Sequence, residues 1–157
     1  MKKFNLFFRI ITLIALPSLA VASAQEVEIL NQTNLKRAQK NLKPLKLNDK
    51  LTQVACAQSI LMAKTNSLSH DVHGQNLTYR VENSGYTYQA IAENIALSSH
   101  PIPANAVVKM WMNSSSHRRN ILNHRLDEIG IGISVASNGG IYYTQVFGRR
   151  NYKKGWK

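Results

Sequence analysis

Apolar residues recur every three or four positions through the first half of the chain, the spacing of helices that bury one face. This pattern predicts a helix over 26–41 and a second over 49–66. Pro44 separates them because its ring cannot sit inside a helix, and Asn48 is expected to cap the second helix. The expected buried face of the first helix contains Val27, Leu30, Asn34 and Arg37.

Shorter patterns follow these two helices. Residues 77–83 are predicted to form a short helix that stops at Gly85. The segment AIAENIAL at 90–97 fits either a short strand or a buried connector. Pro103 is expected in the first turn of a further helix, which gives way to a short helix over 116–122.

The hydrophobic period changes to two near the end of the chain. Residues 128–137 and 140–148 read as two strands joined by the turn sequence SNGG. Isoleucines occupy one face of the first strand. Gly130 and Gly132 occupy the other, where another element must approach closely. Helices followed by a hairpin predict an α+β domain with helices packed on a small antiparallel sheet.

The first residues read as an export signal and not as part of the fold. A basic start, an apolar run of about a dozen residues and small residues at 22–24 are typical of a signal peptide. We expect a signal peptide over 1–24 that is cleaved after Ala24, with an uncleaved anchor as the alternative. One domain over 25–148 would then be secreted or periplasmic, and no later segment is apolar enough to predict a transmembrane helix.

Positive charge is the strongest compositional feature. The formal net charge is +12, and Lys2, Lys3 and Arg9 of the signal segment supply only three of these charges. A basic tail, RRNYKKGWK, occupies 149–157. A basic exported protein favours anionic partners such as a phosphate-bearing cell-envelope component. No nucleic-acid motif is present, so we expect no specific nucleic-acid binding, and a merely solvated tail is the alternative.

Candidate chemistry rests on residues that no local motif joins. Cys56 lies among apolar residues at helical spacing and is expected to be a buried, inert thiol, with an intermolecular disulfide as the alternative. No two histidines stand four apart and there is no Cys-x-x-Cys, so local spacing predicts no metal site. His70, Glu93 and His117 stand out because each lies where a regular element begins or ends. Glu93 also interrupts an apolar segment and needs a partner.

Three serines at 114–116 precede His117 and raise the alternative of a nucleophile beside its base. The chain has no Gly-x-Ser-x-Gly elbow and no sign of an oxyanion hole. We therefore interpret Ser116 as the N-cap of the short helix, with Ser114 and Ser115 close beside it. Catalytic residues stay unassigned.

Six blocks, taken in order, resemble the CAP superfamily, also called the SCP-domain family. This superfamily includes cysteine-rich secretory proteins, antigen 5 and plant pathogenesis-related proteins. The resemblance covers nearly all of the chain after residue 24 and is closest to the short bacterial members. The blocks are LSH at 68–70, YRVENSGY at 79–86, AENIA at 92–96, WMNSSSHRRNIL at 111–122, EIGIGI at 128–133 and YYTQVFG at 142–148.

The resemblance implies an α-β-α sandwich with a central cleft. In the family pattern two His and two Glu point into that cleft, and in some members they hold a divalent metal, often zinc. By matching motifs, His70 and His117 take the two His positions and Glu93 takes the first Glu position. Ser114 stands where the second Glu would be, as in the short bacterial pattern.

A His-Glu-His set can hold zinc through three ligands and leave a fourth position open, where a bound water could be activated. We expect an exported binding protein whose cleft, lined by His70, Glu93, Ser114 and His117, takes a divalent metal or a small polar ligand. A metal- or His-assisted hydrolase acting on peptide or cell-wall material is one alternative. A lipid or sterol carrier is another, although that family role maps onto no residue here. A basic envelope-adhering protein with an inert cleft is the third.

Overall fold

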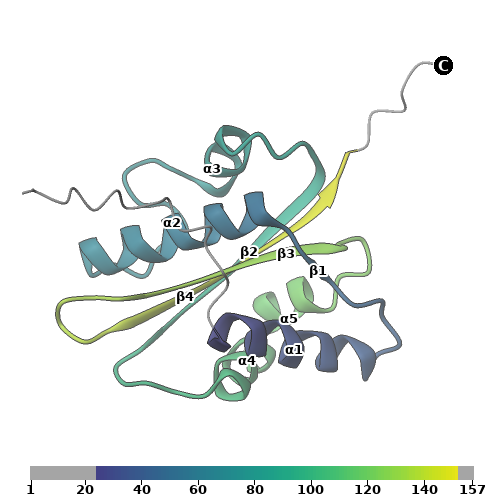
Figure 1. The fold of residues 1–157 in the computed structure, drawn as a ribbon, viewed down its shortest axis with the longest axis horizontal. Coiled ribbons are helices and arrows are strands. Elements are labelled where there is room, and N and C mark those ends of the chain that lie inside the picture. Colours follow the sequence, from purple (N-terminus) through teal and green to yellow (C-terminus); the bar gives the residue numbers. More distant parts are fainter. Residues whose placement is uncertain (1–23, 152–157) are drawn as a thin grey trace, which may run out of the picture.

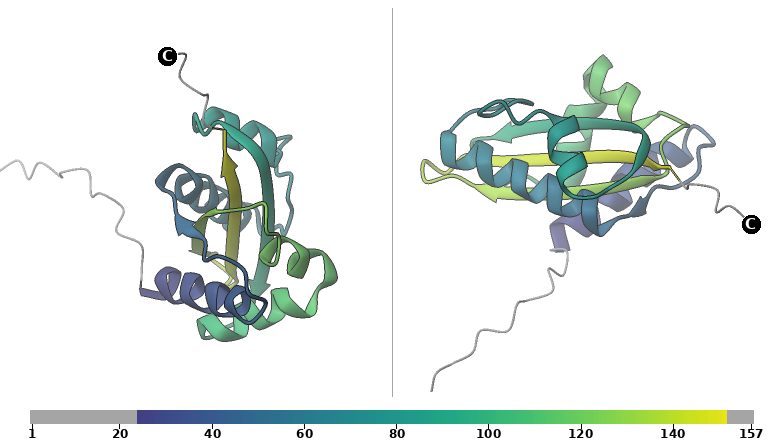
Figure 2. Two further views of the ribbon diagram at one scale, coloured as in Figure 1. Left: turned by 90° about the vertical axis from the view of Figure 1, so that its right-hand side faces the viewer. Right: turned by 90° about the horizontal axis from the view of Figure 1, so that it is seen from above.

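The computed structural model describes residues 24–151, which form three layers with a sheet between two groups of helices (Figure 1). Two helices, α2 (Asp49–Thr65) and α3 (Leu77–Asn83), lie over one face, as the view from above in Figure 2 shows. The other face carries α1 (Ala24–Ala38), α4 (Ala104–Asn113) and α5 (Ser115–Ile121). The predicted α+β sandwich is confirmed. Most of the predicted signal peptide and of the basic tail lies outside the described residues.

The sheet has four strands in the order β1-β3-β4-β2. The strands are β1 (Lys46–Leu47), β2 (Tyr88–Ser98), β3 (Glu128–Val135) and β4 (Ile141–Arg150). The hairpin of β3 and β4 was predicted, and the ambiguous AIAENIAL segment is a strand, β2, that pairs antiparallel with β4. The unpredicted β1 pairs parallel with β3 over only two residues, too few to carry a recognisable period. Within residues 24–151 no helix is both long and apolar enough to cross a bilayer.

Helix α2 lies directly on β3, at the two glycines that predicted a close approach. A Cβ added to Gly130 would stand 2.0 Å from the backbone carbon of Leu51, and one added to Gly132 would stand 2.4 Å from that of Ala55. Helix backbone therefore packs on strand backbone with no side chain between them. The Ser59 hydroxyl strengthens this contact by donating to the Gly132 carbonyl at 2.9 Å.

The opposite face holds the larger apolar core. Trp111 of α4 is 1% exposed and donates its indole N–H to the Ile95 carbonyl of β2 at 3.1 Å. Ile129 and Ile131 of β3 point into the same core, as the period of two predicts. Since α5 begins two residues after α4 ends, this anchoring of α4 also places the start of α5 beside β2.

The buried face of α1 agrees with the prediction at Arg37 and differs from it elsewhere. Ile29, Thr33 and Arg37 are buried, whereas Val27 is 44% exposed. Two of the three buried residues are polar, so apolar spacing could not identify this face. Burial lowers the pKa of Arg37, and nearby Asp127 partly offsets that effect. The Arg37 guanidinium donates to the carbonyls of Lys43, Ile121, Asn123 and Leu126.

The helix ends test the predicted caps. Asn48 caps α2 through two backbone N–H groups, and Gly85 follows the end of α3 with φ 70°, both as predicted. Pro103 directly precedes α4 and does not lie in its first turn. Ser114, not Ser116, is the residue before α5, and its side chain makes no capping hydrogen bond. Three consecutive serines are equally suitable caps, so the sequence could not choose among them.

Candidate functional site

The candidate site lies at the edge of the sheet formed by β2, the outermost strand on that side. Consecutive strand residues point to opposite faces. Glu93 accordingly contacts Arg80 of α3, and Asn94 contacts α5. His70 follows the end of α2 and His117 lies within α5, so the two histidines belong to different layers on either side of β2.

On the side of α2 and α3, the Glu93 carboxylate binds the His70 ring. His70 Nδ1 lies 2.8 Å from Glu93 Oε1. The Glu93 side chain is 2% exposed and that of His70 is 56% exposed. A buried acid thus anchors an exposed ring. The predicted need of Glu93 for a partner is met in part by this histidine.

Arg80 is the site residue that sequence reasoning missed. Its Nη1 and Nη2 donate to the two Glu93 carboxylate oxygens at 2.7 and 3.0 Å. Nη2 also donates to the His70 carbonyl at 3.1 Å, and Nε donates to the Gln75 carbonyl at 3.0 Å. The side chain of Arg80 is only 6% exposed. One guanidinium therefore fixes both the acid behind His70 and the backbone of His70 itself.

A sequence signal for Arg80 existed but was weak. The residue lies in YRVENSGY, one of the family-like blocks, within a helix of seven residues. So short a helix has no apolar period that would separate a buried arginine from a solvated one. Its partner Glu93 lies on β2, and only the packing of α3 against that strand brings the two charges together.

The tautomer of His70 follows from these donors. Arg80 donates to both carboxylate oxygens, so the carboxylate acts as acceptor and His70 Nδ1 carries the shared hydrogen. The neutral ring then has its lone pair on Nε2, the atom left to bind a proton, a hydrogen-bond donor or a metal ion. A carboxylate behind an imidazole fixes ring orientation in this way in metal sites.

On the other side of β2, His117 is half-buried in α5. Its carbonyl accepts a hydrogen bond from Asn94 Nδ2 at 3.2 Å. Burial lowers the pKa of His117, and the charge of nearby His70 lowers it further. The lowered pKa favours the neutral ring of His117, the state required of a metal ligand.

The fold and the order of the sequence blocks agree with one known family. The pattern of the CAP family, described as the Cysteine-rich secretory protein family, matches residues 30–147. The chain belongs to this family. The resemblance inferred from the six blocks is thereby confirmed.

Bacterial relatives of this CAP domain span a range of lengths. Protein YkwD of Bacillus subtilis, itself uncharacterized, is 35% identical over 132 residues, which are 81% of this chain and 48% of YkwD. The crystal structure of an extracellular SCP-domain protein from Bacillus anthracis has a TM-score of 0.73 at 30% identity, over 80% of this chain and 40% of that one. An outer surface protein from Borrelia burgdorferi has a TM-score of 0.74 at 24% identity, over 83% of this chain and 97% of that protein. The chain thus spans about half or less of the first two and nearly all of the third.

The candidate metal donors of this CAP domain are two histidines and the carboxylate that contacts one of them. Between residues 24 and 151, no three His, Cys, Asp or Glu side chains form a group that could hold a metal ion together. At Glu93, Arg80 and His70 already engage both carboxylate oxygens. The carboxylate orients the His70 ring, and the imidazoles of His70 and His117 are nitrogen donors of a kind that zinc accepts.

The serines of the CAP domain are not joined to a base. Ser114 Oγ lies 3.1 Å from Ser116 Oγ, between α4 and the start of α5. Among the described side chains, no hydrogen bond links either serine to His117. The other three histidines, His73, His100 and His124, are exposed and lie in turns or bends. Cys56 is half-buried and not fully buried as predicted, and burial raises the pKa of its thiol.

A second feature of the surface is a pair of adjoining basic hollows. Both are lined by His124 and Arg149. The hollow of about 230 Å³ adds Arg125, and the one of about 440 Å³ adds Lys43 and Asp127. The carboxylate of Asp127 lies 3.8 Å from Arg149 and offsets part of that charge. The remaining cations leave this end of the molecule basic.

Proposed function

We propose that this CAP domain is an extracellular or envelope binding protein whose site at the edge of β2 takes a divalent metal ion, zinc first, or a small polar ligand. The observation that carries the proposal is the chain of contacts from Arg80 through Glu93 to His70. Removing a charge pair from water is costly. Here such a pair orients one exposed imidazole, which supports a role for that ring in binding.

In this proposal His70 Nε2 and the ring of His117 are the protein ligands. Water or atoms of a bound molecule complete the coordination, and Glu93 holds the tautomer and direction of His70. Bound zinc would polarise such a water or ligand atom. Ser114, at the position of the missing second acid, leaves the His117 side of the site without a carboxylate, which favours a binding role over a hydrolase.

Zinc titration of untagged protein tests the proposal. We expect one zinc ion per chain by calorimetry, with affinity reduced at least about ten-fold in His70→Ala and in His117→Ala. His124→Ala is the matched control, because it removes an exposed histidine outside the site, and its affinity should stay within about two-fold of the wild type. Absence of zinc binding, or equal affinity in all four proteins, would overturn the metal assignment.

Export is part of the same proposal. Its support is the signal pattern over 1–24, together with relatives described as an extracellular protein and as an outer surface protein. Determining the N-terminal residue of protein recovered outside the cytoplasm tests it. A mature chain that begins at Gln25 is the expected result, and a chain that stays with the cytoplasm and keeps residues 1–24 contradicts it.

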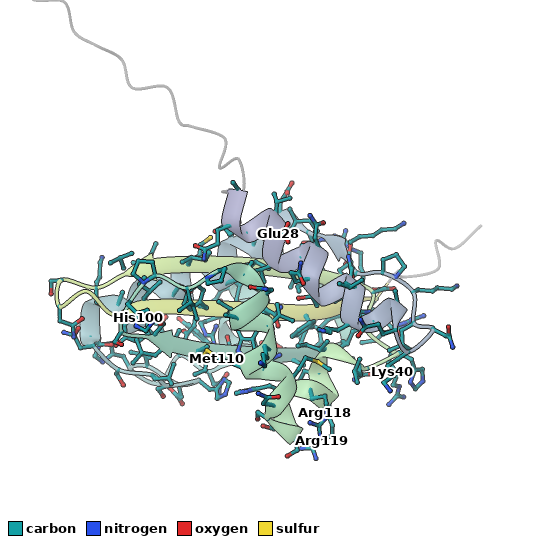
Figure 3. All side chains as sticks on the ribbon, turned by 90° about the horizontal axis from the view of Figure 1, so that it is seen from below. Glu28, Lys40, His100, Met110, Arg118 and Arg119 are labelled. Carbon is teal, nitrogen blue, oxygen red and sulfur yellow. The ribbon has the colours of Figure 1, made fainter. Side chains whose placement is uncertain are left out.

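The basic hollows favour a second binding function, toward a linear phosphate-bearing polymer of the envelope. The two hollows adjoin at His124 and Arg149 and so offer successive positions for a repeating anion. Arg118 and Arg119 of α5 project away from the sheet (Figure 3) and line a separate hollow with Ser115 and Leu122. Because Arg149 and Arg150 belong to β4, deletion of 149–157 would damage the sheet. Point substitutions are the better test.

The test uses inorganic polyphosphate as the probe. The double variant Lys43→Gln with Arg125→Gln should bind more weakly than wild type. The slope of log affinity against log salt should fall by about two, one for each cation removed. The control double variant, Lys64→Gln with Lys109→Gln, removes two positive charges from α2 and α4 instead. It should keep most of the affinity for polyphosphate. Equal losses in the two variants would mean that net charge alone, and not this surface, attracts the polymer.

A further inference from the structure

We infer that Asn94 and Asn120 are positioning residues that hold His117 opposite His70 across β2. The inference rests on the proposed function of that site. It starts from two neighbouring residues of one strand. Glu93 supports the ring of His70, and Asn94, one peptide unit later and on the opposite face, supports the helix that carries His117.

Asn94 is fully buried, and its side chain joins three elements. The Nδ2 group donates to the His117 carbonyl of α5 at 3.2 Å and to Gln145 Oε1 of β4 at 3.2 Å. Its Oδ1 accepts a hydrogen bond from Asn120 Nδ2 at 2.9 Å. Both donor hydrogens and one acceptor position are thus used, which leaves this amide one orientation in the structure.

Asn120 completes the attachment of α5 from the other direction. Its Nδ2 donates to the carbonyl of Glu93 at 3.1 Å as well as to Asn94 Oδ1. Residues 117 and 120 lie three apart and share one side of the helix. Helix α5 therefore meets the edge strand at two points on one helical turn, and His117 lies at one of them.

The network ends in the core and not in solvent. Gln145 Nε2 donates to Thr33 Oγ1 of α1 at 2.8 Å, and Thr33 Oγ1 donates to the Ile29 carbonyl at 2.7 Å. Asn94, Gln145 and Thr33 are each 0% exposed. A satisfied buried network of this kind specifies one geometry more strictly than apolar packing would. The peptide unit between residues 93 and 94 thus joins the support of the His70 ring to the support of the His117 backbone.

The test compares two asparagines that each make two hydrogen bonds. Asn120 is half-buried, so Asn120→Ala leaves the apolar core intact. Asn34 is the matched control, because its side chain also makes two hydrogen bonds, to the backbone of Leu45 at 2.8 and 3.0 Å, away from the site. We expect Asn120→Ala to weaken zinc binding about ten-fold and Asn34→Ala to change it less than about two-fold.

A combined variant shows whether the effect passes through His117. In a His117→Ala background, Asn120→Ala should cause no further loss of zinc affinity, because the residue it positions is already absent. An equal loss in both backgrounds would mean that Asn120 acts on zinc by another route. That result would overturn the inference.

Hydrogen exchange of metal-free protein supplies a readout that needs no zinc. Amides of α5 should exchange faster in Asn120→Ala than in Asn34→Ala, with α2 unchanged in both. Unchanged exchange in α5, or faster exchange with unaltered zinc affinity, overturns the positioning role. A wild type that binds no zinc while α5 loosens as expected would refute the metal proposal instead. The two failures are thus distinguishable.

Discussion

The two faces of the sheet satisfy many of their buried polar groups by different means. The face under α2 and α3 uses carboxylates, with Arg80 and His70 on Glu93 and with Tyr86 on Glu128. On the opposite face neutral amides and a hydroxyl form a network, from Asn94, Asn120, Gln145 and Thr33, and the buried guanidinium of Arg37 donates to backbone carbonyls. A buried charge whose partner is removed costs several kcal/mol, whereas a neutral hydrogen bond contributes about 1 kcal/mol. A substitution that removes a partner of a buried carboxylate should therefore lower the free energy of unfolding more than a substitution in the amide network.

The largest effect is expected from Arg80→Met, which leaves the Glu93 charge buried without its guanidinium. The free energy of unfolding should fall by about 3–5 kcal/mol, measured by urea denaturation. Arg119→Met removes an exposed arginine of α5 and should change it by less than about 0.5 kcal/mol. Similar losses of unfolding free energy in the two variants would show that the burial of Arg80 does not make its removal more costly.

A second large effect should come from the close contact of α2 with β3. Gly130→Ala places a methyl group where the Leu51 backbone now lies, so the helix must move away from the strand. We expect a loss of about 3 kcal/mol in thermal or urea unfolding. At Gly140 a new Cβ would meet only side-chain atoms, the nearest being Asn138 Oδ1 at 3.1 Å. If Gly140→Ala were as costly as Gly130→Ala, the backbone contact would not be the cause.

On the amide face, Thr33→Val keeps the shape of the side chain but removes its hydroxyl. The Ile29 carbonyl loses a donor, and the Gln145 amide loses its acceptor within the core. We expect the free energy of unfolding to fall by about 2 kcal/mol. Thr78 of α3 is exposed, and Thr78→Val should be nearly neutral. If Thr33→Val lowered the free energy of unfolding as much as Arg80→Met, the proposed difference between the two faces would be wrong.

The smallest effect concerns alkaline pH. Burial and the hydrogen bond to Glu128 raise the pKa of Tyr86 far above its ordinary value near 10. Below about pH 10 the folded and unfolded states both keep the phenolic proton. Above it the unfolded state loses that proton first, so stability falls as pH rises. Tyr86→Phe should remove up to about 1.4 kcal/mol of this fall per pH unit between about pH 10 and 11. The measurement is urea unfolding at several pH values. If the free energy of unfolding fell equally steeply with pH in wild type and variant, the prediction would be contradicted.

Elements with a repeating pattern were predictable from the sequence. Gly130 and Gly132, on one face of a strand of isoleucines, correctly indicated a backbone contact. The cap at Asn48 and the hairpin of β3 and β4 also carry local signals and were confirmed. The face of α1 was predicted only in part, because Arg37 is buried as expected whereas Val27 is exposed and the polar Thr33 is buried. The burial of Thr33 depends on a partner far along the chain, because Gln145, 112 positions later, donates a hydrogen bond to its hydroxyl.

The candidate site was predictable as a set of residues but not as an arrangement. His70, Glu93 and His117 follow from the blocks, and the isolation of Glu93 among apolar residues correctly indicated a required partner. That the partner is chiefly Arg80, and that the two histidines lie in different layers, depends on which face of β2 each residue takes. A strand of mixed burial does not reveal this until its pairing with β4 is known.

The alternation at residues 93 and 94 also bears on how β2 finds its place during folding. As an edge strand, β2 is paired on one side only, and a slip of one residue along β4 would exchange its two faces. Glu93 would then lie among the buried amides as an unpaired charge. Asn94 would face the Arg80 guanidinium, which would lose its negatively charged partner. Such a slip is penalised on both faces at once. Glu93 and Asn94, which are proposed to organise the binding site, therefore also fix the register of the edge strand β2 on β4.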